Sequence, residues 1–399
     1  MNVSPSFIDV NKPAHLGASQ SLSRPPLIDY ALSGLRRCWL PSHGRWSHIY
    51  HLDGRDSPNE SVPHSDVFYT LNVLLGMSRL DAIPEDVDVP AIFKQNALQL
   101  TKMPVAKYAF GMALWAGAQL KLAIPPDVAQ SLEILLEDRK NWNLFRAQDL
   151  GMLLTGIIAQ AKAGHEKWLR FADPLFSFLI ERYYGPSGLF FDAPYGLRRR
   201  FASFATQTYL TIACYHYGEF TGNSRAIEMA NTCTRKLIAL QGPNGEWPWF
   251  FDAQGGRVVD FYEIYSVHQY GMAPAFLECA ERHGVHEARP ALIRGFHWIF
   301  GANQLRKSML VPTLQLSIRS QARKAELRSK SGRILRALAN VGFGRSSALI
   351  DSSDVGLRLE CRSYELGWIL WSFGQRSDLP ELTHHQIFRD VSAVLESHV

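Results

Sequence analysis

Apolar residues recur at helical spacing along most of the chain from Asp66 onward, and strand-like alternation is scarce. The helical segments come in pairs that are separated by clusters of Gly, Pro and Asn. The first members of the pairs are expected at 66–80, 106–122, 145–163, 201–220, 260–283 and 359–374. Their partners are expected at 90–101, 127–138, 166–183, 224–240, 287–301 and 381–397.

A repeat of six helix pairs predicts an all-α chain that closes on itself as an (α/α)6 toroid, with an inner ring of helices inside an outer ring. A helical solenoid is the rival fold, but its repeats are usually shorter and more uniform. Several first members carry glycines at mid-helix, as a crowded inner ring requires. Residues 1–27 are expected to form a flexible arm and 28–399 a single domain, with a first short helix at 28–38.

In a toroid of hairpins the inner helices all run the same way, so their N-termini meet at one mouth. Unpaired N–H groups and positive dipole ends gather there and favour an anion or a carboxylate. The alternative is that the polar groups of these first turns are ordinary helix caps. The side chains expected to bind a substrate at the mouth are Asp66, Tyr69, Gln148, Asp149, Gln207, Tyr265, Gln269, Arg362 and Glu365.

An insertion at 302–358 separates the fifth and sixth pairs. Within 306–336, Arg and Lys recur and Glu326 is the only acid. Apolar residues at roughly helical spacing predict an amphipathic helix with a basic face: Leu314, Ile318, Ala322, Leu327, Ile334 and Leu338. Such a helix could be a lid over the mouth, or a surface for an acidic polymer or for peripheral contact with anionic lipid. The pattern favours an ordinary solvated helix.

The bulk composition narrows the function classes. The formal net charge is +5 over 399 residues, and no nucleic-acid-binding module is recognisable, so a nucleic-acid partner is not expected. No apolar run is long enough to span a membrane, and no secretion signal opens the chain. Five scattered cysteines without a CxxC pair indicate reduced thiols in a cytoplasmic protein. Phosphate-loop, dinucleotide, hydrolase-elbow and zinc motifs are missing, so no cofactor and no metal site are expected.

Residues 241–247 spell QGPNGEW, a Q-x-x-x-G-x-W pattern. The glycine allows the chain to reverse after a helix, and Gln and Trp can pack that helix end onto its neighbours. The pattern resembles the QW motif of squalene-cyclase-type terpenoid cyclases and also the turn common in six-hairpin glycosidase-like proteins. A terpenoid-cyclase-like enzyme is the less favoured alternative, because the chain has a single copy and neither a DxDD nor a DDxxD acid motif.

Carboxylates follow this turn and also open the last inner helix. Glycosidic chemistry needs a positioned acid and base, often assisted by Tyr or His. The candidates are Asp260, Glu263 or Glu360 as acid or base, with Tyr262 or His268 assisting. Residues 266–269 fit a capping box, so a helix could begin there and leave 260–265 as a mouth loop, with a kink at Pro274. The alternative is that Glu263 and His268 are buried, hydrogen-bonded structural groups.

Three strings, AQDLGMLL (147–154), YSVHQYGMAP (265–274) and ECRSYELGWILWSF (360–373), resemble an uncharacterised bacterial family of six-hairpin glycosidase-like proteins found around polysaccharide biosynthesis. The resemblance implies a toroid and brings no catalytic residues with it. Tyr265, Ser266, Gln269 and Gly271 are also similar, over a short stretch, to the C-terminal helical domain of glucuronyl C5-epimerases.

The expected function is therefore action on a saccharide or polysaccharide, expected to be acidic, as a hydrolase, lyase or epimerase. A non-catalytic glycan-binding or scaffold protein is the main alternative.

Overall fold

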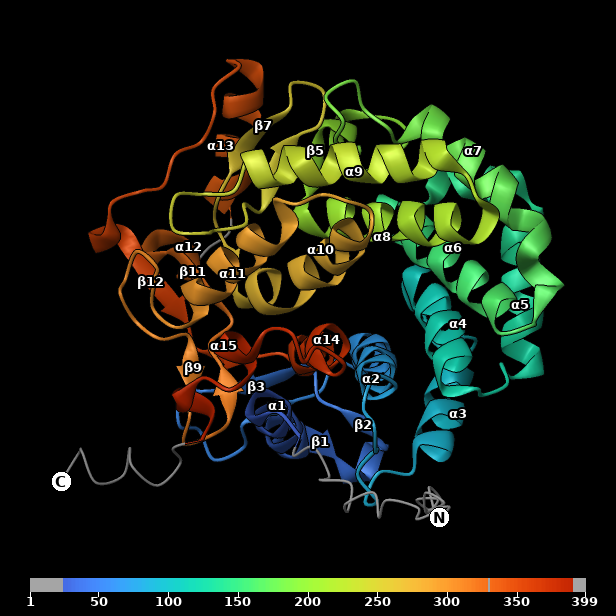
Figure 1. The fold of residues 1–399 in the computed structure, drawn as a ribbon, viewed down its shortest axis with the longest axis horizontal. Coiled ribbons are helices and arrows are strands. Elements are labelled where there is room, and N and C mark those ends of the chain that lie inside the picture. The colour runs from blue at the N-terminus through green and yellow to red at the C-terminus, as the bar shows by residue number, and fades with distance from the viewer. Residues whose placement is uncertain (1–23, 329–330, 390–399) are drawn as a thin grey trace, which may run out of the picture.

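The computed structural model describes residues 24–328 and 331–389, in which six helices form a closed inner ring (Figure 1). Each contacts the next in chain order, and the last returns to the first. The ring consists of α2 (Pro63–Met77), α4 (Tyr108–Leu120), α6 (Ala147–Lys162), α8 (Phe204–Thr221), α10 (Ala273–Arg282) with the short π-helical turn η5 (His268–Met272) before it, and α14 (Ser363–Phe373). The expected (α/α)6 toroid is confirmed.

Close approach of the inner helices depends on glycines, as the sequence predicted. A Cβ atom added at Gly111 of α4 would lie 2.3 Å from the backbone carbon of Met152 in α6. One added at Gly76 of α2 would lie 2.2 Å from the carbonyl oxygen of Gly367 in α14. Real Cβ atoms do not approach backbone so closely, so any side chain at these positions would push the helices apart.

The outer layer contains α3 (Val89–Gln99), α5 (Pro126–Glu137), α7 (Ala172–Arg182), α9 (Ser224–Ala239) and α11 (Ala288–Ile299). Short 3-10 turns precede or follow some of them: η2 (Arg139–Leu144) after α5 and η3 (Glu166–Phe171) before α7.

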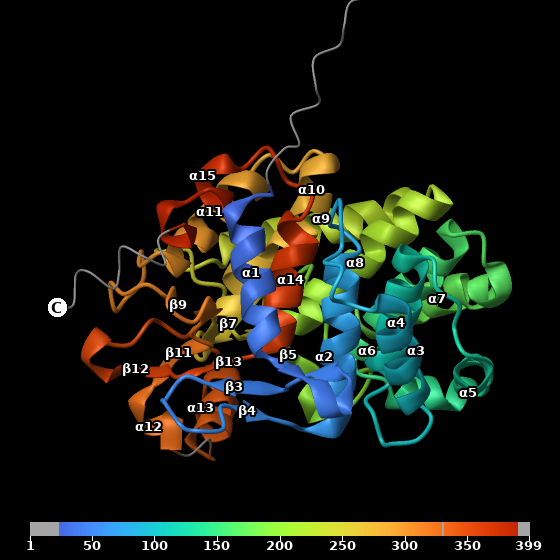
Figure 2. The ribbon, with the colours of Figure 1, turned by 90° about the horizontal axis from the view of Figure 1, so that it is seen from below.

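The outer partner of the last inner helix is not where the sequence placed it. The predicted helix at 381–397 is represented by α15 (Pro380–Thr383) and η7 (Gln386–Phe388), and 390–397 lie outside the described residues. Instead, α1 (Pro26–Arg37) from the start of the chain packs along α14 (Figure 2). Leu27, Ile28 and Leu35 of α1 are buried there, so the N-terminal helix supplies the apolar face that covers α14. The expected arm at 1–27 falls mostly on residues 1–23, which lie outside the described residues.

The turn at 241–247 joins α9 to the next hairpin. Gln241 donates from Nε2 to the carbonyl oxygens of Gly245 and Ala291, at 3.0 and 3.1 Å, which ties the end of α9 to α11. Gly245 has a φ of +95°, which favours glycine. Trp247 is fully buried beside Phe276 of α10 and Phe204 of α8. The turn therefore has the packing role that its sequence predicted.

The insertion is not the long amphipathic helix that the sequence predicted. It begins with strands β9 (Leu310–Val311), β10 (Leu316–Ser317) and β11 (Ser320–Arg323), continues through α12 (Lys324–Arg328) and α13 (Ser331–Gly342), and ends with η6 (Ser352–Asp354) and β12 (Val355–Arg358). Strand β11 lies between β12 and β8 (Ile264–Tyr265) in an antiparallel sheet. Helical spacing from Leu314 to Ala322 was misleading, because ladder partners far along the chain satisfy this backbone as extended structure.

Three predicted helix starts, at 201, 260 and 359, are also strands, the last of them at Glu360–Cys361. Residues 201–203 form β5 (Phe201–Ser203), which pairs with β6 (Phe250–Asp252), and β6 pairs with β7 (Arg257–Asp260). The helical backbone after Asp260 begins at Ser266, where the capping-box alternative placed it, and turns π-helical from His268. Pro274 lies in the first turn of α10, directly after the π-helical turn. A proline at this position costs no hydrogen bond, so the expected kink of a regular helix is not needed there.

The strands gather at one end of the ring. In Figure 2, α1, α14, α2 and α4 stand upright, and β3 (Ile49–His51), β4 (Asn59–Glu60) and β13 (Glu360–Cys361) lie at their lower end with α12 and α13. Strand β3 pairs with both β4 and β13. The remaining elements are η4 (Leu197–Arg200) and the hairpin β1 (Trp39–Leu40) and β2 (Arg45–Trp46), joined by η1 (Pro41–His43).

All five cysteines lie within the described residues, are buried and form no disulfide. No helix in the described part of the chain is both long and apolar enough to cross a membrane. A cytoplasmic location stays a prediction.

Candidate functional site

The first turns of the inner helices meet at one end of the ring, as the sequence predicted. Contacts link each neighbouring pair around the circle. Three of the links are contacts between rings: Phe68 with Tyr108, Phe204 with His268, and Tyr364 with Tyr69. The others are hydrogen bonds: Asp149 accepts from the N–H of Tyr108, Asp192 accepts from the N–H of Ala147 and from the hydroxyl of Thr206, and Tyr270 donates to Glu365. We call this end the mouth.

Three half-buried aromatic side chains stack on one side of the mouth. The ring of Tyr69 lies between those of His48 and Tyr364, with centroids 4.6 and 4.4 Å away. The hydroxyls of Tyr69 and Tyr364 make no hydrogen bond to another described residue. Burial raises the pKa of Tyr69 to about 12 and also raises that of Tyr364, so both phenols stay protonated at neutral pH. They can therefore donate hydrogen bonds to a bound oxygen.

Arg319 stands beside this stack. Its guanidinium lies 3.2 Å from an oxygen of Glu360, 2.8 Å from an oxygen of Glu365, and 4.8 Å from the ring centroid of Tyr265. Its side chain keeps 14% of its accessible surface. The insertion supplies Arg319, whereas the two glutamates lie in β13 and in the first turn of α14. Tyr69, Tyr265, Arg319, Glu360, Tyr364 and Glu365 are called the mouth cluster below.

Glu365 is the carboxyl group of the mouth cluster whose acidity is most suited to proton transfer. It is fully buried, and Tyr270 donates to its Oε2 at 2.8 Å. Burial raises the pKa of Glu365 to about 7, against the opposing effect of Arg319. A carboxyl group poised near neutrality can both give and take a proton.

Glu360 is half-buried and is shared by two arginines. Arg362 donates to its Oε1 at 2.8 Å, and Arg319 contacts the same oxygen. Glu360 lies in β13 and Arg362 directly before α14, so the two side chains can meet although they are only two positions apart.

Glu263 is placed under the mouth in a bidentate ion pair. Arg358 of β12 donates to its two carboxylate oxygens at 2.9 and 2.8 Å, and Ser320 adds a hydrogen bond at 2.8 Å. Only 1% of Glu263 is exposed. A carboxylate that is held in this way is neutralised in the resting structure, which fits the structural alternative for this residue.

Asp260 is held similarly. Arg323 of β11 donates to both its oxygens at 2.7 and 3.0 Å, and the Asp260 side chain is fully buried. The ring of Tyr262 lies under the same guanidinium, and its hydroxyl bonds to Gln304 and to the N–H of Ile350. These contacts join β7 to the insertion and lie outside the mouth cluster.

His268 is buried between Phe204 and Tyr265. Burial, with a smaller effect of Arg319, lowers the pKa of His268 to about 3, so its imidazole is neutral. One ring nitrogen bonds to the backbone of Trp247, and Nδ1 has no partner among the described residues. His48 is also neutral, with a pKa near 3 for the same main reason.

The other predicted binding residues mostly secure the fold. Asp66 accepts from Ser61 and from the N–H of Val62, and Asp149 closes a capping box at the start of α6. Gln207 holds both backbone groups of Phe190, and Gln269 bonds to Trp247 and Tyr265. Gln148 is half-exposed and makes no side-chain hydrogen bond to a described residue.

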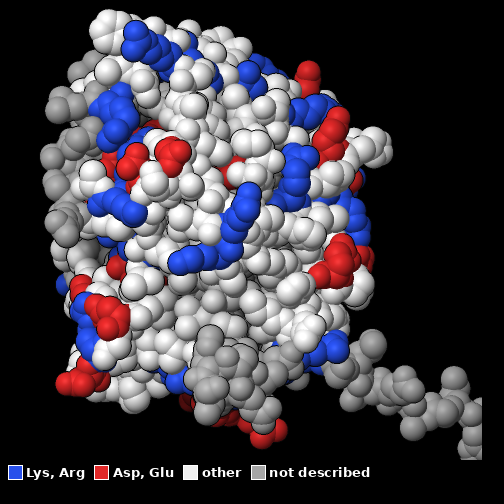
Figure 3. All heavy atoms as spheres, turned by 90° about the vertical axis from the view of Figure 1, so that its left-hand side faces the viewer, with Lys and Arg blue, Asp and Glu red and all other residues white. Residues whose placement is uncertain are grey.

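Sequence reasoning missed Arg319, Arg358, His48, Tyr270 and Tyr364. The insertion's basic residues were expected on a solvated helix face, and no sequence pattern placed His48 at the mouth. The strings around Tyr270 and Tyr364 were recognised, but helical spacing did not separate these tyrosines from core residues. Figure 3 shows the side of the molecule on which the insertion lies, with Lys and Arg scattered among acidic residues and residues of all other kinds. Peripheral membrane contact through 306–336 stays a prediction.

Comparison with protein-family models and with curated protein sequences finds no match. Solved structures of similar fold include a sugar epimerase from a ruminal bacterium, with a TM-score of 0.60 at 10% identity over 88% of this chain and 97% of that one. The cellobiose 2-epimerase of Bacillus thermoamylovorans B4167 has a TM-score of 0.58 at 11% identity, over 88% and 98% of the two chains. An unsaturated glucuronyl hydrolase specific for heparin has a TM-score of 0.56 at 12% identity, over 90% and 98%.

At these identities the likeness shows the fold alone. This chain has the six-hairpin glycosidase-like toroid fold. The resemblance to the bacterial family around polysaccharide biosynthesis stays a prediction.

Proposed function

We propose that this protein is a carbohydrate-active enzyme that binds an acidic saccharide at the mouth and acts on it by acid/base chemistry, as a hydrolase, lyase or epimerase. The observation that carries the proposal is Arg319, a partly exposed cation among tyrosines that is joined to a carboxyl group with a pKa near 7. Enzymes of similar fold bear names that refer to saccharides, which supports a saccharide as the substrate.

Each group at the mouth has a chemical task in this proposal. Arg319 and Arg362 would attract the negative charge of the saccharide, because guanidinium groups suit carboxylates. The stacked rings of Tyr69 and Tyr364 would pack against the apolar face of a sugar ring, and their hydroxyls would donate hydrogen bonds. Glu365 or Glu360 would transfer the proton, and His268 would assist. Glu263 and Asp260 would act only after release from Arg358 and Arg323.

The test uses a panel of uronate-containing oligosaccharides and neutral sugars of the same linkage. Products would be sought by mass spectrometry for hydrolysis and elimination, and by deuterium exchange at C5 for epimerisation. Turnover is expected with the acidic substrates and is expected to fall at least a hundredfold in Glu365→Gln or Glu360→Gln, in line with the loss of a general acid or base. Glu137→Gln, in an exposed ion pair, is the matched control.

Unchanged turnover in both mouth variants would remove these residues from the mechanism. If turnover is lost only in Glu263→Gln and this variant is folded, the acid or base would be Glu263, one of the three carboxylates that the sequence proposed.

A non-catalytic glycan-binding protein is the second candidate. The observation that favours it is the pairing of Asp260 and Glu263 with Arg323 and Arg358, which leaves these carboxylates no free basic oxygen in the resting structure. Saturable binding of an acidic glycan without any product in the three assays would support this candidate.

A further inference from the structure

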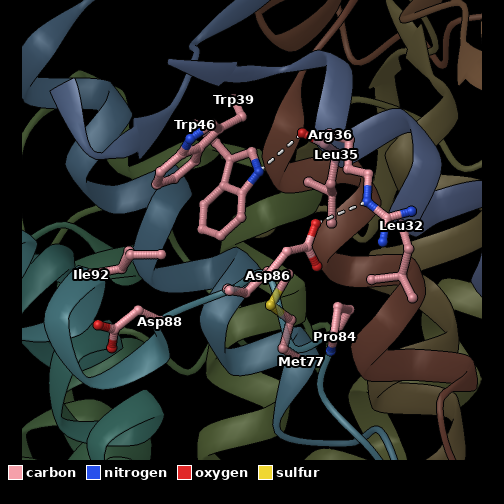
Figure 4. A pocket seen from close by; sticks show the side chains of 11 residues that line it. Leu32, Leu35, Arg36, Trp39, Trp46, Met77, Pro84, Asp86, Asp88 and Ile92 are labelled. Atoms are coloured by element: carbon pink, nitrogen blue, oxygen red, sulfur yellow. Dashed lines mark hydrogen bonds and ion pairs between the residues drawn. The ribbon is translucent and has the colours of Figure 1, made fainter. Parts of the chain in front are cut away.

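A pocket lies on the outside of the ring, between α1, α3 and the β1–β2 hairpin (Figure 4). It has a volume of about 410 Å³, within the range of small-molecule sites. Its lining shares no residue with the mouth cluster and consists of Leu32, Leu35, Arg36, Trp39, Trp46, Met77, Pro84, Asp86, Val87, Asp88 and Ile92.

The inner wall of this pocket is apolar and rigid. Leu35, Trp46 and Met77 are 1, 2 and 2% exposed, respectively, and belong to α1, β2 and the C-terminal end of α2. A ligand with an apolar part would gain packing contacts by filling this open recess, because the buried side chains of its inner wall have no partner atoms on the side of the recess. Water is a poor occupant, because a water molecule needs polar partners.

Two polar side chains of the lining are already bonded to the backbone, and two more lie at the rim. The indole N–H of Trp46 is already bonded to the carbonyl oxygen of Leu35 at 3.1 Å, and Asp88 caps α3 through the N–H of Ala91. The charged pair Arg36–Asp86, 3.3 Å apart, lies at the rim, where its side chains are 62% and 59% exposed. In Figure 4 this pair stands on the side of the cavity across from Ile92. The pocket is therefore apolar within and polar at its edge.

We propose that this pocket binds an amphiphile, with an aliphatic chain against Leu35, Trp46 and Met77 and an uncharged polar head at Arg36 and Asp86. A saccharide fits less well, because Leu35, Trp46 and Met77 offer its hydroxyls no unpaired donor or acceptor. A charged head is disfavoured at Arg36 and Asp86, since these two side chains present both signs of charge in a matched pair. An uncharged hydroxyl can accept from Arg36 and donate to Asp86 at once.

Titration calorimetry of the full chain with straight-chain alcohols tests the proposal. Hexanol, heptanol and octanol are expected to bind at one site, with the dissociation constant falling about fourfold for each added methylene. Octane with a hydroxyl at both ends is the matched ligand. It is expected to bind roughly tenfold or more weakly than octanol, because its second hydroxyl would be buried without a partner.

Variants locate the site. Leu32→Phe and Ile92→Phe, from opposite walls, should each fill part of the cavity and weaken octanol binding at least tenfold. Leu144→Phe, at an exposed position in η2, should bind octanol as the wild type does. Thermal unfolding of each variant shows whether it is folded. Because two variants fill the cavity, the test still holds if one of them does not fold.

The proposal is overturned if octanol shows no saturable binding, if both filling variants bind it normally, or if the diol binds equally well. It is also overturned if the wild type is a dimer that both filling variants dissociate, because the pocket would then be an interface between two copies. None of these results bears on saccharide turnover at the mouth.

Discussion

Arg319 and Glu365 form a 2.8 Å ion pair that joins the insertion to the first turn of α14. The glutamate is fully buried and Arg319 is nearly so, and the same guanidinium also contacts Glu360. Some of the insertion's basic side chains therefore pair with buried carboxylates instead of facing solvent. Its arginines at 319 and 323 are the partners of carboxylates that the sequence had assigned to the mouth.

Removal of Arg319 from this pair should lower the free energy of unfolding at alkaline pH. In Arg319→Gln, ionised Glu365 would be left buried without its cation, and we expect unfolding free energy to fall by about 3 kcal/mol at pH 8. At pH 5 the loss should be smaller, because Glu365 is then protonated. Urea unfolding at both pH values measures the difference. The double variant Arg319→Gln/Glu365→Gln should recover part of the loss, and equal losses at both pH values would contradict this account.

Glu365 should make the stability of the wild type depend on pH. Burial raises its pKa from 4.5 to about 7 in the folded protein. The folded state therefore binds the proton more tightly, and this contribution is fully present below pH 4.5 and is lost as pH rises through 7. The expected loss is up to about 3 kcal/mol between pH 4.5 and 8. Glu365→Gln should remove that part of the slope in denaturant unfolding, and a variant with the wild-type slope would show that another group titrates.

The Asp260–Arg323 pair should contribute to stability. Asp260→Asn would weaken a buried bidentate pair, and we expect a loss of about 3 kcal/mol in unfolding free energy. Asp53→Asn, in the exposed pair with Arg55, is the control and should leave the unfolding free energy unchanged, because an exposed ion pair contributes little. Urea unfolding compares the two variants. A loss of turnover in Asp260→Asn without any loss of stability would instead support the acid/base role.

Gly111→Ala should separate α4 from α6. The added Cβ would lie 2.3 Å from the Met152 backbone, and overpacking against backbone is expected to cost about 3 kcal/mol. Gly342→Ala, in α13, is the control, because a Cβ there meets nothing within 4 Å. It should be neutral or slightly stabilising, by up to about 1 kcal/mol. A Gly111→Ala protein as stable as the wild type in thermal unfolding would contradict the close packing of the ring.

The helical part of the fold could be predicted because its signals are local. Glycines at positions such as Gly76 and Gly111 indicated the close inner ring, and 241–247 indicated a packing turn. The strands could not be predicted in the same way. Residues 320–323 pair with 264–265 and 355–358, and nothing in a short window reveals such distant partners.

The candidate site, too, could be predicted only in part. By itself, the sequence determined that the chain would form paired helices and that polar and aromatic first turns, including Tyr69 and Glu365, would meet at one mouth, because helical periodicity and capping act over a few residues. Only the tertiary structure decided which charges neutralise one another. Arg319, Arg323 and Arg358 reach Glu365, Asp260 and Glu263 across 46, 63 and 95 positions of the chain. The electrostatic state of a buried carboxyl group depends on such neighbours and on its burial, and both are set by the fold.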